Sequence, residues 1–145
     1  DKMIRVFSIH NDAPELVSEW EAHEHSVFTL AFSPDGRHLL SGSRDARIRR
    51  WDVTNRFNAD VSVNAHLFAI HQVSFSPDGE HFLTCSMDKT IKLWSSADLG
   101  LLRVIDRARH DGHRSSVNRV VWLDAERFAS AGDDRSIMTW QVTFP

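Results

Sequence analysis

The chain has 145 residues, a usual length for one domain, and 41% of them are hydrophobic, which is enough for a substantial core. The formal net charge of -3 argues against bulk attraction to nucleic acid or anionic lipid, because phosphate binding needs a basic excess. A single cysteine, Cys85, fits a reducing cytoplasmic location, and no window approaches the run of about 18 apolar residues that a membrane span needs.

The first complete set of predicted strands lies between Ala22 and Val53. Short alternating runs at 27–32 and 38–43 are joined by the sequence Ser-Pro-Asp-Gly at 33–36. Proline presets the backbone of a turn and glycine accepts a positive φ, so this tetrapeptide predicts a tight turn. A third run ends at Trp51, and 60–64 predicts a fourth strand.

The same pattern recurs twice along the chain. Residues 65–96 align with 22–53 without a gap, and 112–142 align with one residue deleted at the first turn. The predicted strands of these copies are 70–75, 82–86, a run ending at Trp94, 101–106, 117–122, 128–131 and a run ending at Trp140. Upstream, Phe7 aligns with the tryptophans and Asp1 with a turn aspartate, so the chain begins within a further copy.

Each complete copy holds a histidine, a hydroxyl, an aspartate and a tryptophan at matched spacing. The three tetrads are His23, Ser41, Asp45 and Trp51; His66, Thr84, Asp88 and Trp94; and His113, Ser130, Asp134 and Trp140. Serine, histidine and aspartate together suggest a nucleophile, its base and an orienting acid. An active site has no reason to occur three times, however, so we expect the tetrads to be structural.

These features resemble the WD-repeat β-propeller family. The resemblance depends on the pairs Ala22-His23, Ala65-His66 and Gly112-His113, the second-strand hydroxyl, the turn aspartate and the closing tryptophan. It implies an all-β fold of about three and a half four-stranded antiparallel blades, and a hydrogen-bond chain from indole to hydroxyl to imidazole to carboxylate. The implied units are half a blade (1–21), two blades (22–64 and 65–111) and a last blade lacking its outer strand (112–145).

The resemblance also implies a protein-binding face, formed by the loops into each first strand and the turns before each third strand. Family contact positions lie three and five residues after the blade histidine and one residue before the turn aspartate. They correspond here to Ser26, Phe28, Arg44, Ala69, His71, Met87, Ser116, Asn118 and Asp133. This mixture suits a protein interface, although ordinary rim residues around a channel have a similar composition. The enlarged loop 106–113 is expected at the same face, either as a binding loop or as a tolerated insertion.

Other candidate sites are less well supported. The pairs His23/His25 and His110/His113 invite a zinc hypothesis, but one member of each pair belongs to a tetrad, so we expect neither metal nor cofactor. The basic stretch Arg44–Arg50 aligns with a blade strand of the second copy, which favours a solvated strand over a nucleic-acid site. Arg50 replaces the apolar Leu93 of that copy and would need a partner if buried.

We therefore expect a non-catalytic scaffold that binds a protein or peptide. Two alternatives stay open, the propeller domain of a larger enzyme or regulatory protein, and nucleic-acid binding through Arg44, Arg47, Arg49 and Arg107. Propellers close with about four to eight blades, so the copies present here do not complete a ring. We expect either the C-terminal half of a protein of about seven blades whose native N-terminus lies upstream, or two chains sharing one ring; the start on a turn aspartate favours the former.

Overall fold

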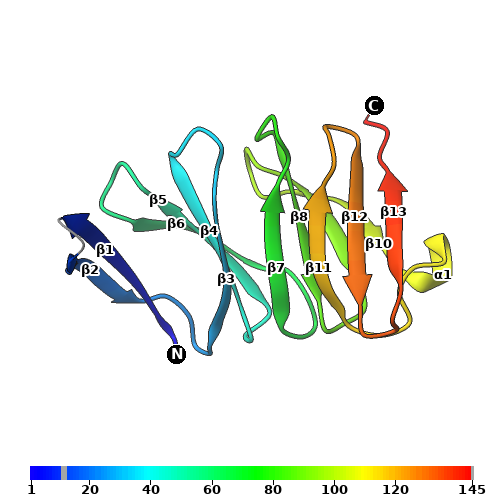
Figure 1. The fold of residues 1–145 in the computed structure, drawn as a ribbon, viewed down its shortest axis with the longest axis horizontal. Helices are drawn as coiled ribbons and strands as arrows, with labels where there is room; N and C mark the ends of the chain where they lie inside the picture. Colours follow the sequence, from blue (N-terminus) through cyan, green and yellow to red (C-terminus); the bar gives the residue numbers. More distant parts are fainter. Residues whose placement is uncertain (11–12, 145) are drawn as a thin grey trace.

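The structure is a computed structural model that describes residues 1–10 and 13–144. Within this part of the chain, antiparallel strands form four small sheets that stand side by side along the longest axis of the molecule (Figure 1). The predicted all-β fold, a partial β-propeller, is confirmed.

Chain order is also strand order within each sheet, because strands that are consecutive within a sheet pair with one another. The first sheet has two strands, β1 (Met3–His10) and β2 (Ala13–Glu21). The next two sheets have four strands each, and the last has three. Their strands are β3 (Val27–Phe32), β4 (His38–Ser43), β5 (Arg47–Asp52) and β6 (Asn58–Asn64); β7 (Ile70–Phe75), β8 (His81–Ser86), β9 (Ile91–Ser95) and β10 (Leu101–Ile105); and β11 (Val117–Trp122), β12 (Arg127–Gly132) and β13 (Ile137–Gln141).

The first strands of the three larger sheets, β3, β7 and β11, lie beside one another (Figure 1). The bounds of these three strands and of β4 are as predicted, and the other predicted strands differ by one or two residues at an end. The predicted turns also form, since Gly36 and Gly79 have φ values of +72° and +75°. The residue limits assigned to the four units remain predictions.

The only helix in the described residues is α1 (Arg107–His110), at the right edge of Figure 1, in the enlarged loop before the last blade. Asp106 caps its N-terminus by accepting the backbone N–H of Arg109 at 2.9 Å. With four residues, α1 is far too short to cross a lipid bilayer.

The hydrophobic core lies between neighbouring sheets, in three separate clusters. Ile4 and Trp51 belong to the cluster between the first two sheets, and Leu40 and Val73 to the next. Leu83 and Val120 belong to the cluster between the last two. Neighbouring sheets are therefore held together by apolar contact.

Part of this apolar pattern is uncovered towards the two ends of the row of sheets. Leu30 is 50% exposed, although its counterparts in the next two blades, Val73 and Val120, are 3% and 1% exposed. At the other end Ile137 is 80% exposed, whereas Ile48 and Ile91 at the same repeat position are buried. The buried counterparts pack in the clusters between the last three sheets, and Leu30 and Ile137 belong to none of the three clusters.

Candidate partner-binding face

The structure brings the four members of each predicted tetrad together. In the blade formed by β7–β10, Trp94 Nε1 donates to Thr84 Oγ1 at 2.9 Å, and Thr84 Oγ1 lies 2.7 Å from His66 Nε2. His66 Nδ1 lies 2.8 Å from Asp88 Oδ2. The hydroxyl and the imidazole are both buried, so this chain of hydrogen bonds is closed to solvent at its centre.

Burial favours the neutral form of the histidine in this chain. It lowers the pKa of His66 despite the opposing effect of Asp88. Because a carboxylate only accepts hydrogen bonds, the neutral ring carries its proton on Nδ1 and donates it to Asp88. Nε2 is then an acceptor, so Thr84 Oγ1 accepts from Trp94 Nε1 and donates its own hydrogen to His66 Nε2.

The same bonds form in the other two complete copies. Trp51 Nε1 donates to Ser41 Oγ at 2.9 Å, and Ser41 Oγ lies 2.7 Å from His23 Nε2. In the last blade Trp140 Nε1 donates to Ser130 Oγ at 2.8 Å, which lies 2.8 Å from His113 Nε2. The remaining links, from His23 Nδ1 to Asp45 Oδ2 and from His113 Nδ1 to Asp134 Oδ1, measure 2.9 and 3.0 Å.

The tetrad aspartates also fix the loops above them. Besides the imidazole, Asp88 accepts the backbone N–H of Leu67 at 3.1 Å, and its other oxygen accepts the N–H of Thr90. Burial alone would raise the pKa of Asp88, but the hydrogen bonds from His66, Thr90 and Leu67 hold it well below its usual range. The corresponding loop bonds are Glu24 N–H to Asp45 and Arg114 N–H to Asp134.

A second set of bonds joins each of these loops to the turn beside it. The backbone N–H of Met87 donates to the carbonyl of Ala69 at 3.0 Å, and the other two blades have equivalent bonds, from Arg44 to Ser26 and from Asp133 to Ser116. The loops 24–26, 67–69 and 114–116 and the turns 44–46, 87–89 and 133–135 therefore lie at one end of the sheets. We call this surface the loop face.

Six of the nine predicted contact residues line two hollows on the loop face. Arg44, Ala69 and Met87 line the first, which measures about 480 Å³ and lies between two blades. Phe28, His71 and Asn118 line the second, of about 490 Å³, beside the first strands. Ser26, Ser116 and Asp133 line neither hollow; the first two supply the carbonyls just described, and Asp133 accepts a hydrogen bond from Asn118.

The sequence prediction missed two prominent residues of the loop face, Leu67 and Phe68. Both line the first hollow, and they are 83% and 57% exposed. A signal was available, because the two positions after the blade histidine hold Glu24-His25 in one copy and Arg114-Ser115 in another. An apolar pair at a position that is charged or polar in the other copies indicates a role specific to that blade and not to the repeat. Arg119, which lines the second hollow, was also missed.

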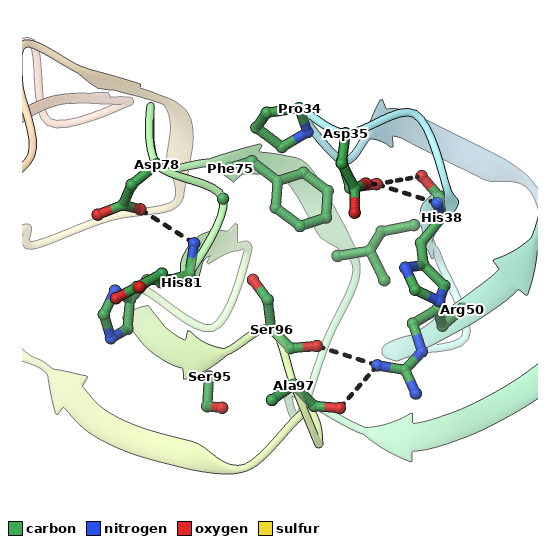
Figure 2. A pocket seen from close by; sticks show the side chains of 14 residues that line it. Pro34, Asp35, His38, Arg50, Phe75, Asp78, His81, Ser95, Ser96 and Ala97 are labelled. Carbon is green, nitrogen blue, oxygen red and sulfur yellow. Dashed lines mark hydrogen bonds between the residues drawn. The ribbon is translucent and has the colours of Figure 1, made fainter.

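A third hollow lies at the opposite end of the sheets and contains the partners that Arg50 was expected to need. It measures about 540 Å³ and lies between the turns that hold Asp35 and Asp78 (Figure 2). Arg50 Nη1 donates to the carbonyls of Ser96 and Ala97 at 2.9 and 3.1 Å, as Figure 2 shows. Its Nη2 lies 2.6 Å from Asp60 Oδ2. Arg50 thus joins two blades, with a carboxylate on its own blade and carbonyls on the next.

Two further groups have chemistry of their own. Asp78, Glu80 and His81 in the third hollow place carboxylate and imidazole atoms within 4.8 Å of one another, a grouping that the sequence analysis did not single out. The histidines of the zinc hypothesis, His23 and His113, are instead bonded within their tetrads. Cys85 is buried, and burial raises the pKa of its thiol to about 12, so it is a core residue and not a reactive thiolate.

Comparison with known proteins gives the same assignment. The family model described as WD domain, G-beta repeat, matches residues 14–52, 60–95 and 106–141. Among curated relatives, the 66 kDa stress protein of Physarum polycephalum is 28% identical over 98% of this chain and 23% of its own length. Actin-interacting protein 1 of Drosophila melanogaster is 31% identical over 97% of this chain and 16% of its own.

The chain thus spans less than a quarter of the length of these two relatives. A solved structure titled "Structure of U3-55K" superposes with a TM-score of 0.76 at 22% identity, over 83% of this chain and 37% of that one, which shows a shared fold. With a family model matching all three complete copies, and the repeated tetrads in place, the chain belongs to the WD-repeat family.

Proposed function

We propose that the chain is a non-catalytic scaffold whose loop face binds a protein or peptide. The observation that supports this most directly is the set of large apolar side chains exposed on a fixed backbone. Phe28, Leu67, Phe68 and Met87 are each at least 50% exposed, and all four line the two hollows of the loop face. Aromatic residues and methionine are enriched in protein interfaces relative to the rest of the surface.

The anchored loops favour binding because their backbone is already ordered before a partner arrives. Leu67 N–H is bonded to Asp88, and the carbonyl of Phe68 accepts a hydrogen bond from Ser86 Oγ at 3.2 Å. A surface held in place before binding avoids much of the entropy loss that association otherwise involves. The name of actin-interacting protein 1 states that this relative interacts with a protein, which supports the same class of partner here.

The tetrads favour a structural role over a catalytic one. The hydroxyls of Ser41 and Thr84 are fully buried and that of Ser130 is 3% exposed, so no substrate reaches them in this structure. Each hydroxyl already has an indole donor and an imidazole acceptor. Nucleic-acid binding along Arg44–Arg50 is less favoured, because Arg50 is engaged by Asp60 and by two carbonyls of the next blade.

The proposal is tested by capturing binding proteins on the immobilised chain and identifying them by mass spectrometry. We expect Phe28→Ala, Arg44→Ala and Met87→Ala each to lower retention by about tenfold, which corresponds to about 1.4 kcal/mol. Matched controls lie off the loop face: Arg37→Ala, at the opposite end, and Leu102→Ala, on an outer strand, where the side chain is 51% exposed against 54% for Met87. Retention that is lost with the controls and kept with the loop-face variants contradicts the proposal.

A further inference from the structure

The blades that begin with β3, β7 and β11 present the same backbone to the solvent but different side chains. The residue after the blade histidine donates its N–H to the tetrad aspartate in every copy, and this residue is Glu24, Leu67 or Arg114. Only the middle blade places apolar side chains here, Leu67 followed by Phe68. Because the backbone bonds are the same, this difference in side chains is not required by the fold.

Leu67 and Phe68 contribute little to the core of the molecule. Neither belongs to any of the three apolar clusters between the sheets. Met87, which is 54% exposed, and the nearly buried Ala69 line the same hollow as Leu67 and Phe68. Exposed apolar side chains gathered around one hollow are typical of an interaction site, since water solvates such a surface poorly.

Two arginines beside these side chains have no carboxylate partner in the described residues. Arg44 lines the same hollow and Arg119 lines the neighbouring one. Neither forms an ion pair with any carboxylate in the part of the chain that the structure describes, in contrast to Arg50 with Asp60. Of the two carboxylates at the first hollow, Asp45 is already bonded to His23, which leaves Glu24.

We propose that the loop face takes an acidic peptide segment, which seats one bulky apolar side chain on Leu67, Phe68 and Met87 and pairs a carboxylate with Arg44. This inference rests on the proposed function and specifies its ligand. The two hollows are neighbours, because Ala69 of the first and His71 of the second are two residues apart and so about 7 Å along an extended segment.

The test is a selection of random 12-residue peptides, displayed on phage, against the complete chain. We expect the enriched peptides to combine Leu, Ile, Phe or Trp with at least one Asp or Glu nearby. A synthetic peptide from the selection should lose about tenfold in affinity with Leu67→Ser and about 30-fold with Arg44→Glu. Changing its acidic residue to Lys should weaken binding to the unmodified chain and restore binding to the Arg44→Glu chain.

The control Arg37→Glu makes the same change in net charge at the opposite end of the sheets, so it should change the affinity less than twofold. An equal loss with Arg37→Glu overturns the specific pairing with Arg44, since bulk charge would then explain the effect. Thermal melts of all variants establish that they fold. Enriched peptides that are basic or uncharged, but still compete at the loop face, overturn this inference and leave the proposed function intact. If no peptide is enriched, or if no loop-face variant changes the affinity of the enriched peptides, both this inference and the proposed function are contradicted.

Discussion

Replacing Thr84 by valine removes one hydroxyl from the middle tetrad with almost no change in shape. Thr84 Oγ1 accepts from Trp94 Nε1 and is bonded to His66 Nε2, and the Thr84 side chain is fully buried. Valine leaves the indole N–H and the imidazole nitrogen without partners. Each buried group that loses its partner costs about 1–3 kcal/mol, so we expect a loss of about 3 kcal/mol in the free energy of unfolding.

Urea denaturation at pH 7.5, followed by tryptophan fluorescence, measures this loss. Thr54→Val is the matched control, because Thr54 Oγ1 also donates a hydrogen bond, to Asp52, but lies exposed at the surface; we expect less than about 1 kcal/mol there. In a chain that already carries Trp94→Phe, Thr84→Val should cost about 1–2 kcal/mol less, because one of the two stranded groups is absent. The reasoning is refuted if Thr84→Val costs no more than Thr54→Val, or if the two tetrad substitutions are additive.

Three more predictions concern the blade interfaces and the histidines. Ile91→Ala should cost about 3 kcal/mol of unfolding free energy and Ile137→Ala less than about 1, because the same repeat position is buried in one blade and 80% exposed in the other; an equal cost in denaturation would mean that another copy covers Ile137 in solution. Arg50→Leu should lower the unfolding free energy by about 1–2 kcal/mol, because the carbonyls of Ser96 and Ala97 lose their donor. The loss stays this small because both carbonyls face a hollow in which water can replace the guanidinium. No change in the urea midpoint would contradict the role of Arg50 in joining blades. Burial lowers the pKa of His66 below its usual 6.5, so the unfolded chain binds a proton more readily than the folded chain. The free energy of unfolding should therefore fall as the pH drops below 6.5, by up to about 1.4 kcal/mol per pH unit. Urea titrations between pH 7.5 and 5.5 measure that slope, and a flat profile argues against a neutral His66.

The strands and the tetrads were predictable from the sequence because each depends on local pattern and on repetition. A turn such as Ser33–Gly36 limits where its flanking strands end, and the repeat then fixes the register of the copies against one another. The tetrads follow because a histidine, a hydroxyl and an aspartate recur at matched spacing, with one residue deleted at the first turn of the last copy.

The features that were not predicted depend on neighbours that are distant in sequence. The acceptor of Arg50 at Ser96 lies 46 residues away on the next blade, and no pattern in either segment announces the contact. The exposure of Leu30 likewise depends on which sheet stands beside it, and the sequence alone shows only an apolar residue at a strand position where other copies have Val73 and Val120.

The double use of each tetrad aspartate explains how one fold presents different binding chemistries. Asp88 Oδ2 bonds both the imidazole of His66 and the backbone N–H of Leu67. The loop is thus held through its backbone, and the side chain of residue 67 is free to vary without disturbing the tetrad. A surface substitution of that kind typically changes the free energy of unfolding by less than about 0.5 kcal/mol. At a binding hot spot the same substitution changes the free energy of binding by more than about 2 kcal/mol. The same hydrogen bonds that stabilise the blade therefore also allow its loop face to acquire a specificity of its own.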